Sequence, residues 1–81
     1  MITTNKIWFE NERIFSNLND GRIVGMPLTW FPRLHNATES QRLNYELWNE
    51  GSWIHWEDLD EDLSVEGFIT FSKNSTQAVL R

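Results

Sequence analysis

The stretch from Asp20 to Leu34, DGRIVGMPLTWFPRL, constrains the fold of this chain more than any other. Asp-Gly supplies the positive φ angles of a two-residue hairpin turn, so residues 19–21 predict a hairpin between two runs rich in apolar and β-branched residues. Residues 22–28 are therefore expected to form the return strand. Pro27 should lie at a sheet edge or at a strand end, because proline donates no ladder hydrogen bond.

A proline-stiffened helical turn is expected to follow this strand. Thr29 can accept a hydrogen bond from the first amide groups of the turn. Pro32 would then occupy the third position, where a missing N–H costs nothing. Trp30, Phe31 and Leu34 would be the apolar anchors of this turn.

Two further strands are predicted before the hairpin turn. Lys6–Phe9 and Arg13–Leu18 alternate in side-chain character, and Asn11-Glu12 suits a tight turn between them. Short loops join neighbouring strands in antiparallel fashion. Together with residues 22–28, these strands predict an antiparallel β-meander.

A helix is predicted over residues 39–49. Thr38 and Gln41 form a capping-box pattern, in which each side chain accepts a hydrogen bond from the backbone of the other residue. Leu43 and Leu47 lie four positions apart, so they would share the buried face of this helix.

The C-terminal part predicts a further strand and a further helical turn. Gly51 is expected to stop the preceding helix, and Trp53–Trp56 is aromatic and β-branched, as strands are. The acidic residues 57–62 would turn away from this strand. Ser64 would cap a last helical turn over residues 65–69.

The expected fold class is therefore α+β, with a small antiparallel meander packed against one or two short helices. At 81 residues the chain forms a single domain, 1–81, with an ordered core of about 6–70 and a tail over 72–81. The predicted core consists of Trp8 or Phe9, Ile14, Val24, Met26, Leu28, Trp30, Leu34, Leu43, Leu47, Ile54 and Trp56.

Charge is unevenly distributed along the chain. The net charge is -5, and residues 43–72 contain eight acidic side chains but no lysine or arginine. This disfavours wrapping a phosphate backbone and permits binding to a basic partner. The chain has no cysteine and no long apolar run, so we expect a cytoplasmic protein without disulfides or a cofactor.

Tryptophan and phenylalanine are frequent, with five of each. A small domain has little interior, so some of these side chains should be exposed and available to a partner or a second copy. The alternative is that they all fill the core. The candidate contact residues are three tryptophans and a rim of acids: Trp48, Trp53, Trp8, Asp58, Asp60, Glu61 and Asp62.

Other polar residues have simpler explanations. Asp58, Asp60 and Asp62 have the spacing of a calcium loop, but the glycine and glutamate of that loop are missing, so no metal site is expected. His55 with Asp58 or Asp60 could support acid–base chemistry, although a lone strand histidine is much more often a packed or surface-paired side chain. Arg22 and Arg33 are expected to pair with the acids of 57–62. The residues assigned structural roles are Gly21, Arg22, Pro27, Trp30, Pro32, Arg33, His55 and Trp56.

Five segments resemble the family called domain of unknown function 2442. They are DGR at Asp20–Arg22, PLTWFPRL at Pro27–Leu34, Ala37-Thr38 with Arg42, the Gly51–Trp56 run and DLDEDLSVEG at Asp58–Gly67. The resemblance implies a small bacterial or phage protein with an antiparallel meander packed on helices. It implies no catalytic residues, and an association with two-gene, toxin–antitoxin-like modules. Some members carry a helix-turn-helix domain, for which this chain has no room.

These observations favour a non-enzymatic module that binds a protein partner or regulates one, and that resembles an antitoxin. Three alternatives remain open: a domain related to transcription regulators, an acidic inhibitor that mimics nucleic acid, and a small hydrolase that uses His55.

Overall fold

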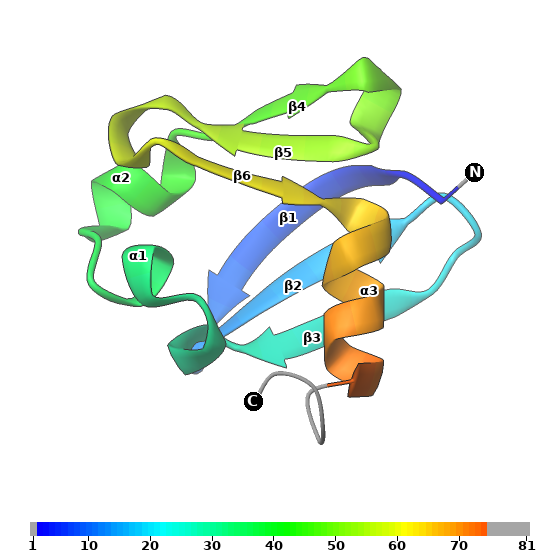
Figure 1. Ribbon diagram of the computed structural model, residues 1–81, viewed down its shortest axis with the longest axis horizontal. Coiled ribbons are helices and arrows are strands. Elements are labelled where there is room, and N and C mark those ends of the chain that lie inside the picture. Colours follow the sequence, from blue (N-terminus) through cyan, green and yellow to red (C-terminus); the bar gives the residue numbers. More distant parts are fainter. Residues whose placement is uncertain (1, 75–81) are drawn as a thin grey trace.

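The computed structural model describes residues 2–74 and confirms a mixed α+β fold (Figure 1). It contains two antiparallel sheets of three strands, with strand orders β1-β2-β3 and β4-β5-β6. The strands are β1 (Thr4–Glu10), β2 (Arg13–Leu18), β3 (Ile23–Pro27), β4 (Glu46–Trp48), β5 (Trp53–Trp56) and β6 (Glu61–Ser64). The helices are α1 (Pro32–His35), α2 (Glu39–Leu43) and α3 (Val65–Asn74), with 3-10 turns at Leu28–Trp30, Asn49–Gly51 and Glu57–Leu59.

The predicted meander is the first sheet. Asn11 and Glu12 form its first turn, both with positive φ angles, of 52° and 60°. The second turn differs from the predicted two-residue type, because the Leu18 N–H donates to the Arg22 carbonyl oxygen at 2.8 Å around a three-residue loop. Gly21 closes this loop with a φ of 95°. A residue of positive φ after a turn is the usual ending of a three-residue hairpin loop.

Pro27 ends β3, which is an edge strand, as the sequence predicted. A helical turn follows it as predicted, but the start of that turn was predicted incorrectly. Thr29 lies inside a 3-10 turn, whereas Phe31 precedes α1 and Pro32 is its first residue. A proline at this position is favoured because its fixed φ suits a helix and its missing N–H has no helical partner. Trp30 is exposed and not a core residue, whereas Leu34 is fully buried.

The helix predicted over residues 39–49 is wrong beyond Leu43. Its capping box is present, with the Gln41 N–H donating to Thr38 Oγ1 at 3.1 Å and the Thr38 N–H donating to Gln41 Oε1 at 2.9 Å. Asn44 then leaves the helical region, and residues 46–48 form β4, paired with β5. Leu43 is consequently 58% exposed, and Leu47 is half-buried.

The acidic run was also predicted only in part. Glu57–Leu59 turns as a 3-10 helix, and Asp60 reverses the chain with a φ of 52°. Residues 61–64 then return as β6 alongside β5, so the run does not simply turn away. The predicted Ser64 cap is present, since the Gly67 N–H donates to Ser64 Oγ at 2.8 Å. The helix that it starts continues to Asn74, and residues 75–81 of the predicted tail lie outside the described residues.

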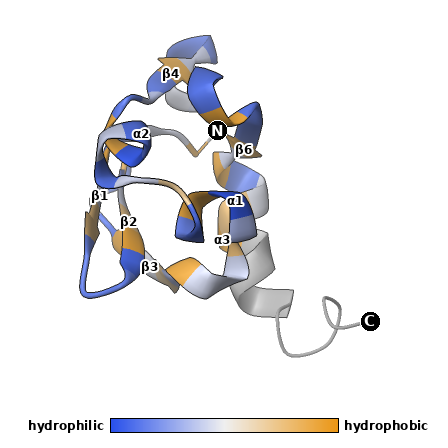
Figure 2. Cartoon of the chain, turned by 90° about the vertical axis from the view of Figure 1, so that its left-hand side faces the viewer, coloured by the Kyte–Doolittle hydropathy of each residue, from blue (hydrophilic) through white to orange (hydrophobic). Residues whose placement is uncertain are grey.

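The core lies between the two sheets and α3, which crosses the inner face of the first sheet (Figures 1 and 2). Six predicted members are buried: Ile14, Met26, Leu28, Leu34, Ile54 and Trp56. Val24, Leu47, Phe9 and Trp8 are half-buried. Phe31, predicted as an apolar anchor of the turn after β3, is buried as well, and the buried residues that were not predicted are Ile7, Leu18, Val65 and Phe68.

Three contacts fix the second sheet against the rest of the chain. The Tyr45 hydroxyl lies 3.3 Å from both the N–H and the carbonyl oxygen of Ile7, so it bridges the loop before β4 to β1. Trp56 Nε1–H donates to the Arg42 carbonyl oxygen at 3.0 Å. Gly51, which does not stop a helix but lies in the β4–β5 turn, packs against Thr4 of β1. The outer face of the second sheet is thereby held in a fixed position.

Candidate functional site

The outer face of the second sheet gathers aromatic and acidic side chains. Side chains alternate across a strand, and the inward-facing Leu47 and Ile54 are register partners. The neighbouring positions therefore point outward. In the register, Glu46 lies opposite His55, and Trp48 lies opposite Trp53. We define the outer face as Glu46, Trp48, Trp53, His55 and Asp62, with the adjoining Glu57.

His55 lies between two carboxylates. Its Nδ1 contacts Asp62 Oδ1, which comes from β6, and its Nε2 lies 2.7 Å from Glu57 Oε1. The predicted partners Asp58 and Asp60 are not the ones used. Hydrogen bonds to Asp62 and then to Glu57 raise the pKa of His55 above its ordinary value, although burial opposes this. With a carboxylate at each nitrogen, the ring is best described as an imidazolium that donates on both sides.

Trp48 covers this histidine. The two rings stack with centroids 4.0 Å apart and planes inclined by 19°. The indole Nε1–H donates to Glu46 Oε1 at 3.0 Å, which orients the ring along its own strand. Trp48 remains 45% exposed and the neighbouring Trp53 40% exposed. The outer face therefore presents two adjacent indoles, one of which lies over a cation.

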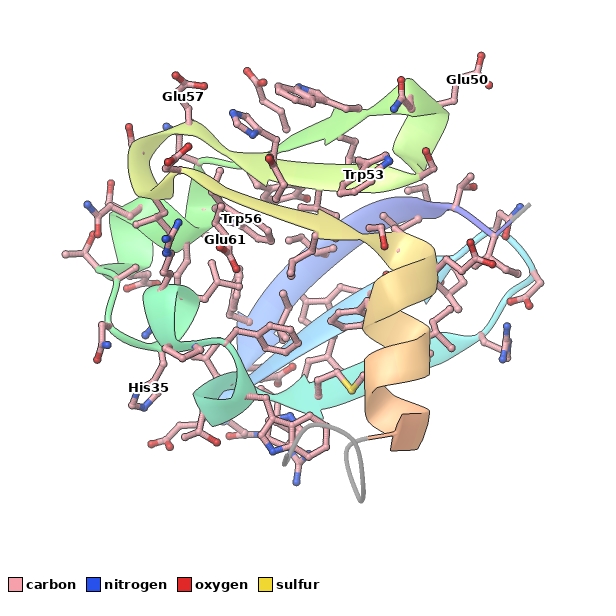
Figure 3. The ribbon with its side chains drawn as sticks, viewed as in Figure 1. His35, Glu50, Trp53, Trp56, Glu57 and Glu61 are labelled. Atoms are coloured by element: carbon pink, nitrogen blue, oxygen red, sulfur yellow. The ribbon has the colours of Figure 1, made fainter. Side chains whose placement is uncertain are left out.

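Exposed acids lie around these indoles. Glu57 and Glu50 point away from the body of the molecule at opposite ends of the second sheet (Figure 3). The side chains of Glu57 and Asp62 are 80% and 52% exposed. Carboxylates beside aromatic faces suit a cationic group, because both attract positive charge.

The other predicted rim acids are placed differently. Asp58 Oδ2 accepts a hydrogen bond from Asn44 Nδ2 at 3.1 Å. The Asp60 backbone oxygen accepts one from Arg33 Nη1 at 2.6 Å, and Glu61 Oε1 lies 3.8 Å from the same nitrogen. Glu61 belongs to the inner side of β6, where burial raises the pKa of its carboxyl. Of the four predicted rim acids, Asp62 is the one in contact with His55.

The two arginines behave differently from each other. The pairing of Arg33 with the acidic run is confirmed by its contacts to Asp60 and Glu61. The same prediction for Arg22 is wrong, because Arg22 Nε donates to Asp20 Oδ2 at 2.8 Å within its own hairpin turn. Asp20 is two residues away, and a local partner leaves the arginine side chain in solvent. The Arg22 contacts hold the pKa of Asp20 below its usual range.

Trp8 does not join the other two tryptophans. It lies on the first sheet, where its ring stacks on Phe15 at 5.5 Å between centroids. Lys6 Nζ lies 5.5 Å from the centre of the Trp8 ring. The three tryptophans proposed as contact residues thus belong to two surfaces, and the surface around Trp8 includes a basic side chain.

A separate cleft of about 350 Å³ lies between the Asn11-Glu12 turn and helices α1 and α2. Phe9, Leu28 and Leu43 line it together with charged side chains of both signs. Arg42 lines one wall and donates to the carbonyl oxygens of Leu34 and His35, at 2.7 and 2.8 Å, which ties it to the end of α1.

The described residues contain neither a metal-binding cluster nor a membrane-spanning helix. Among residues 2–74, no three His, Cys, Asp or Glu side chains converge in a manner that could hold a metal ion. In the same part of the chain, no helix is long and apolar enough to cross a membrane.

Comparisons with known proteins place the chain in a family. The model of a family described as protein of unknown function, DUF2442, matches residues 5–74. The chain belongs to the DUF2442 family. A crystal structure of a protein of unknown function from Rhodospirillum rubrum ATCC 11170 is similar to this DUF2442 chain, with a TM-score of 0.74 and 26% sequence identity. The match covers 86% of this chain and 87% of the other. No curated protein matches the chain significantly.

Two members of the outer face of this DUF2442 protein were missed from the sequence. Glu46 was assigned to a helix, and Glu57 was treated as part of an acidic turn. The sequence signal that could have found Glu46 is the two-residue spacing of a strand, which places Glu46 and Trp48 on one face just as it places Trp53 and His55 on one face. Glu57 also follows His55 by two residues, so it begins on the same side of the chain.

Proposed function

We propose that this protein is a non-enzymatic binding module whose outer face contacts a basic segment of a protein partner. The observation that carries the proposal is the pair of exposed indoles, Trp48 and Trp53, set beside the carboxylates of Glu46, Glu57 and Asp62. Tryptophan is enriched among the residues that dominate binding energy at interfaces. Acids around it favour a positively charged partner and speed encounter with it.

The charge map supports a protein rather than a nucleic acid as the partner. Residues 43–72, which include the whole outer face, contain no lysine or arginine to neutralise phosphates. Mimicry of nucleic acid is less well supported, because the acidic side chains of residues 57–62 point to different partners. Glu61 faces Arg33 and Asp58 is bonded to Asn44, so they form no regular row.

The contacts of His55 support a role other than catalysis. A general base needs a ring nitrogen that can accept a proton. Both nitrogens of His55 face carboxylates, to which they donate, so the ring has no lone pair to offer. An antitoxin-like role fits this proposal, with the product of a neighbouring gene as the basic partner.

Binding of a defined cationic probe tests the proposal. We expect an acetylated and amidated hexa-arginine peptide to bind the purified protein, with an affinity that falls as salt is added. Trp48→Ala and Trp53→Ala should each weaken binding at least tenfold. Trp30→Ala is the matched control, since Trp30 is also an exposed tryptophan but lies outside the second sheet.

Isothermal titration calorimetry measures these affinities, and copurification from the native cell identifies the natural partner. Full affinity in both Trp48→Ala and Trp53→Ala, or an equal loss in Trp30→Ala, would contradict the proposal. Circular dichroism of each variant separates loss of binding from loss of fold.

A further inference from the structure

The outer face already holds a cation on its carboxylates. The His55 imidazolium is surrounded from every element beside it by acids: Glu46 opposite it on β4, Glu57 after β5 and Asp62 on β6. The ring of Trp48 stacks on it. A partner's cation that approaches the same carboxylates must therefore compete with a charge that belongs to the protein.

The two carboxylates in contact with His55 are not equally available. The Glu57 side chain is 80% exposed and points outward from a short 3-10 turn (Figure 3). Asp62 lies within β6, directly opposite His55 in the register, and is 52% exposed. The Glu57 carboxylate is thus the more exposed of the two and lies outside the paired strands, whereas Asp62 sits on β6 facing His55. Glu57 is therefore the carboxylate that a partner can take.

We propose that a guanidinium or ammonium group of the partner takes Glu57 from His55, and that His55 releases its Nε2 proton in exchange. This inference rests on the proposed function and specifies how its site works. The N–H bond at Nε2 breaks and the proton passes to the buffer. Nδ1–H continues to donate to Asp62. One positive charge enters the outer face and one leaves it, so the net charge around His55 does not change.

The sign of the pH dependence follows from this exchange. Glu57 helps to raise the pKa of His55, so losing Glu57 to the partner lowers that pKa. Between the pKa of the complex and that of the free protein, binding expels a proton. Affinity should therefore increase with pH in this window, by up to about tenfold per pH unit for one proton.

Calorimetry in buffers of different ionisation enthalpy counts the protons released. The probe is the hexa-arginine peptide, titrated at several pH values into the parent, Glu57→Gln and His55→Gln. We expect up to one proton released by the parent and none by either variant. Asp58→Asn is the matched control, because it removes an exposed acid next to Glu57 that is not bonded to His55. Its proton release should persist.

The outcomes distinguish this inference from the proposed function. Peptide binding to the parent without proton release, or with proton uptake, overturns the exchange and leaves the binding surface in place. Failure of the peptide to bind the parent overturns both. Proton release that persists in Glu57→Gln also overturns the exchange, and this variant should fold because Glu57 is so exposed. An NMR titration of the His55 ring gives a second readout, in which saturating peptide should lower its pKa.

Discussion

Gly21 and Gly51 form a matched pair for testing how the second sheet is attached. Their φ angles are almost identical, 95° and 94°. A Cβ atom at Gly21 would meet nothing within 4 Å. A Cβ atom at Gly51 would lie 2.4 Å from the Thr4 backbone oxygen, closer than such atoms can approach. Alanine therefore introduces the same backbone strain at both positions and a steric clash at only one of them.

The magnitudes follow from these two effects. A side chain in the left-handed region costs about 1–2 kcal/mol, which is the full expected effect of Gly21→Ala. Gly51→Ala adds an overpacking term of about 1–3 kcal/mol, for a total of about 2–5 kcal/mol. Thr4 cannot easily move away, because it is buried and its hydroxyl accepts from Ser16 Oγ at 2.7 Å and donates to the Asn17 carbonyl oxygen at 2.9 Å.

Urea unfolding followed by tryptophan fluorescence measures both free energies. Thermal melts give a second readout, in which each kcal/mol of lost stability should lower the melting temperature by about 4–8 °C in a domain of this size. Gly51→Ala should thus melt clearly below Gly21→Ala. Equal losses of stability, or a smaller loss in Gly51→Ala, would refute the close packing of the β4–β5 turn on β1.

Three further predictions concern other parts of the chain. Glu12→Gly should stabilise the protein by about 0.5–1 kcal/mol in urea unfolding, because Glu12 occupies the left-handed region in a hairpin turn that favours glycine; a loss of stability would contradict this. In thermal melts, Leu43→Ala should change stability by less than about 0.5 kcal/mol, because Leu43 is exposed, whereas replacing the half-buried Leu47 with alanine should cost about 1–2 kcal/mol. Equal losses in the two variants would instead support the helix predicted over residues 39–49. Folding raises the pKa of His55, so the protonated ring stabilises the folded state. This stabilisation is complete below the unfolded-state pKa of about 6.5, and stability should fall as the pH rises through the folded-state pKa. His55→Gln should remove that slope from unfolding curves recorded between about pH 6 and about pH 9; a slope unchanged in the variant would assign it to other groups.

Local signals predicted the meander and the starts of α2 and α3 well. Turn residues, the Thr38–Gln41 capping box and the Ser64 cap each act over a few neighbouring residues, so the sequence carries them directly. The stretch 44–48 lacked such a signal. Leu43 and Leu47 fit a helical period, whereas Tyr45 and Leu47 fit a strand period equally well. Pairing with β5 decides between the two, and the residues of β5 lie outside the stretch 44–48 that the local pattern covers.

The acidic strand β6 was even harder to predict from the local sequence. Aspartate and glutamate are depleted in strands, so EDLS predicts a turn when read alone. In the fold, Leu63 packs inward opposite Ile54, and Asp62 meets His55 across the pair. The two contacts together compensate for the poor intrinsic preference. Arg33 contributes from α1 by binding the start of the same strand.

The alternation along β5 couples the core to the outer face. Ile54 and Trp56 point inward and are fully buried, while Trp53 and His55 point outward between the two edge strands. A shift of one residue in register would put Trp56 into solvent and turn His55 into the core, away from Glu57 and Asp62, at a cost of both apolar burial and an uncompensated charge. The burial of Trp56 therefore fixes where the outer face lies. A surface fixed in this way needs little further ordering when a partner binds, so more of its contact energy is retained as affinity.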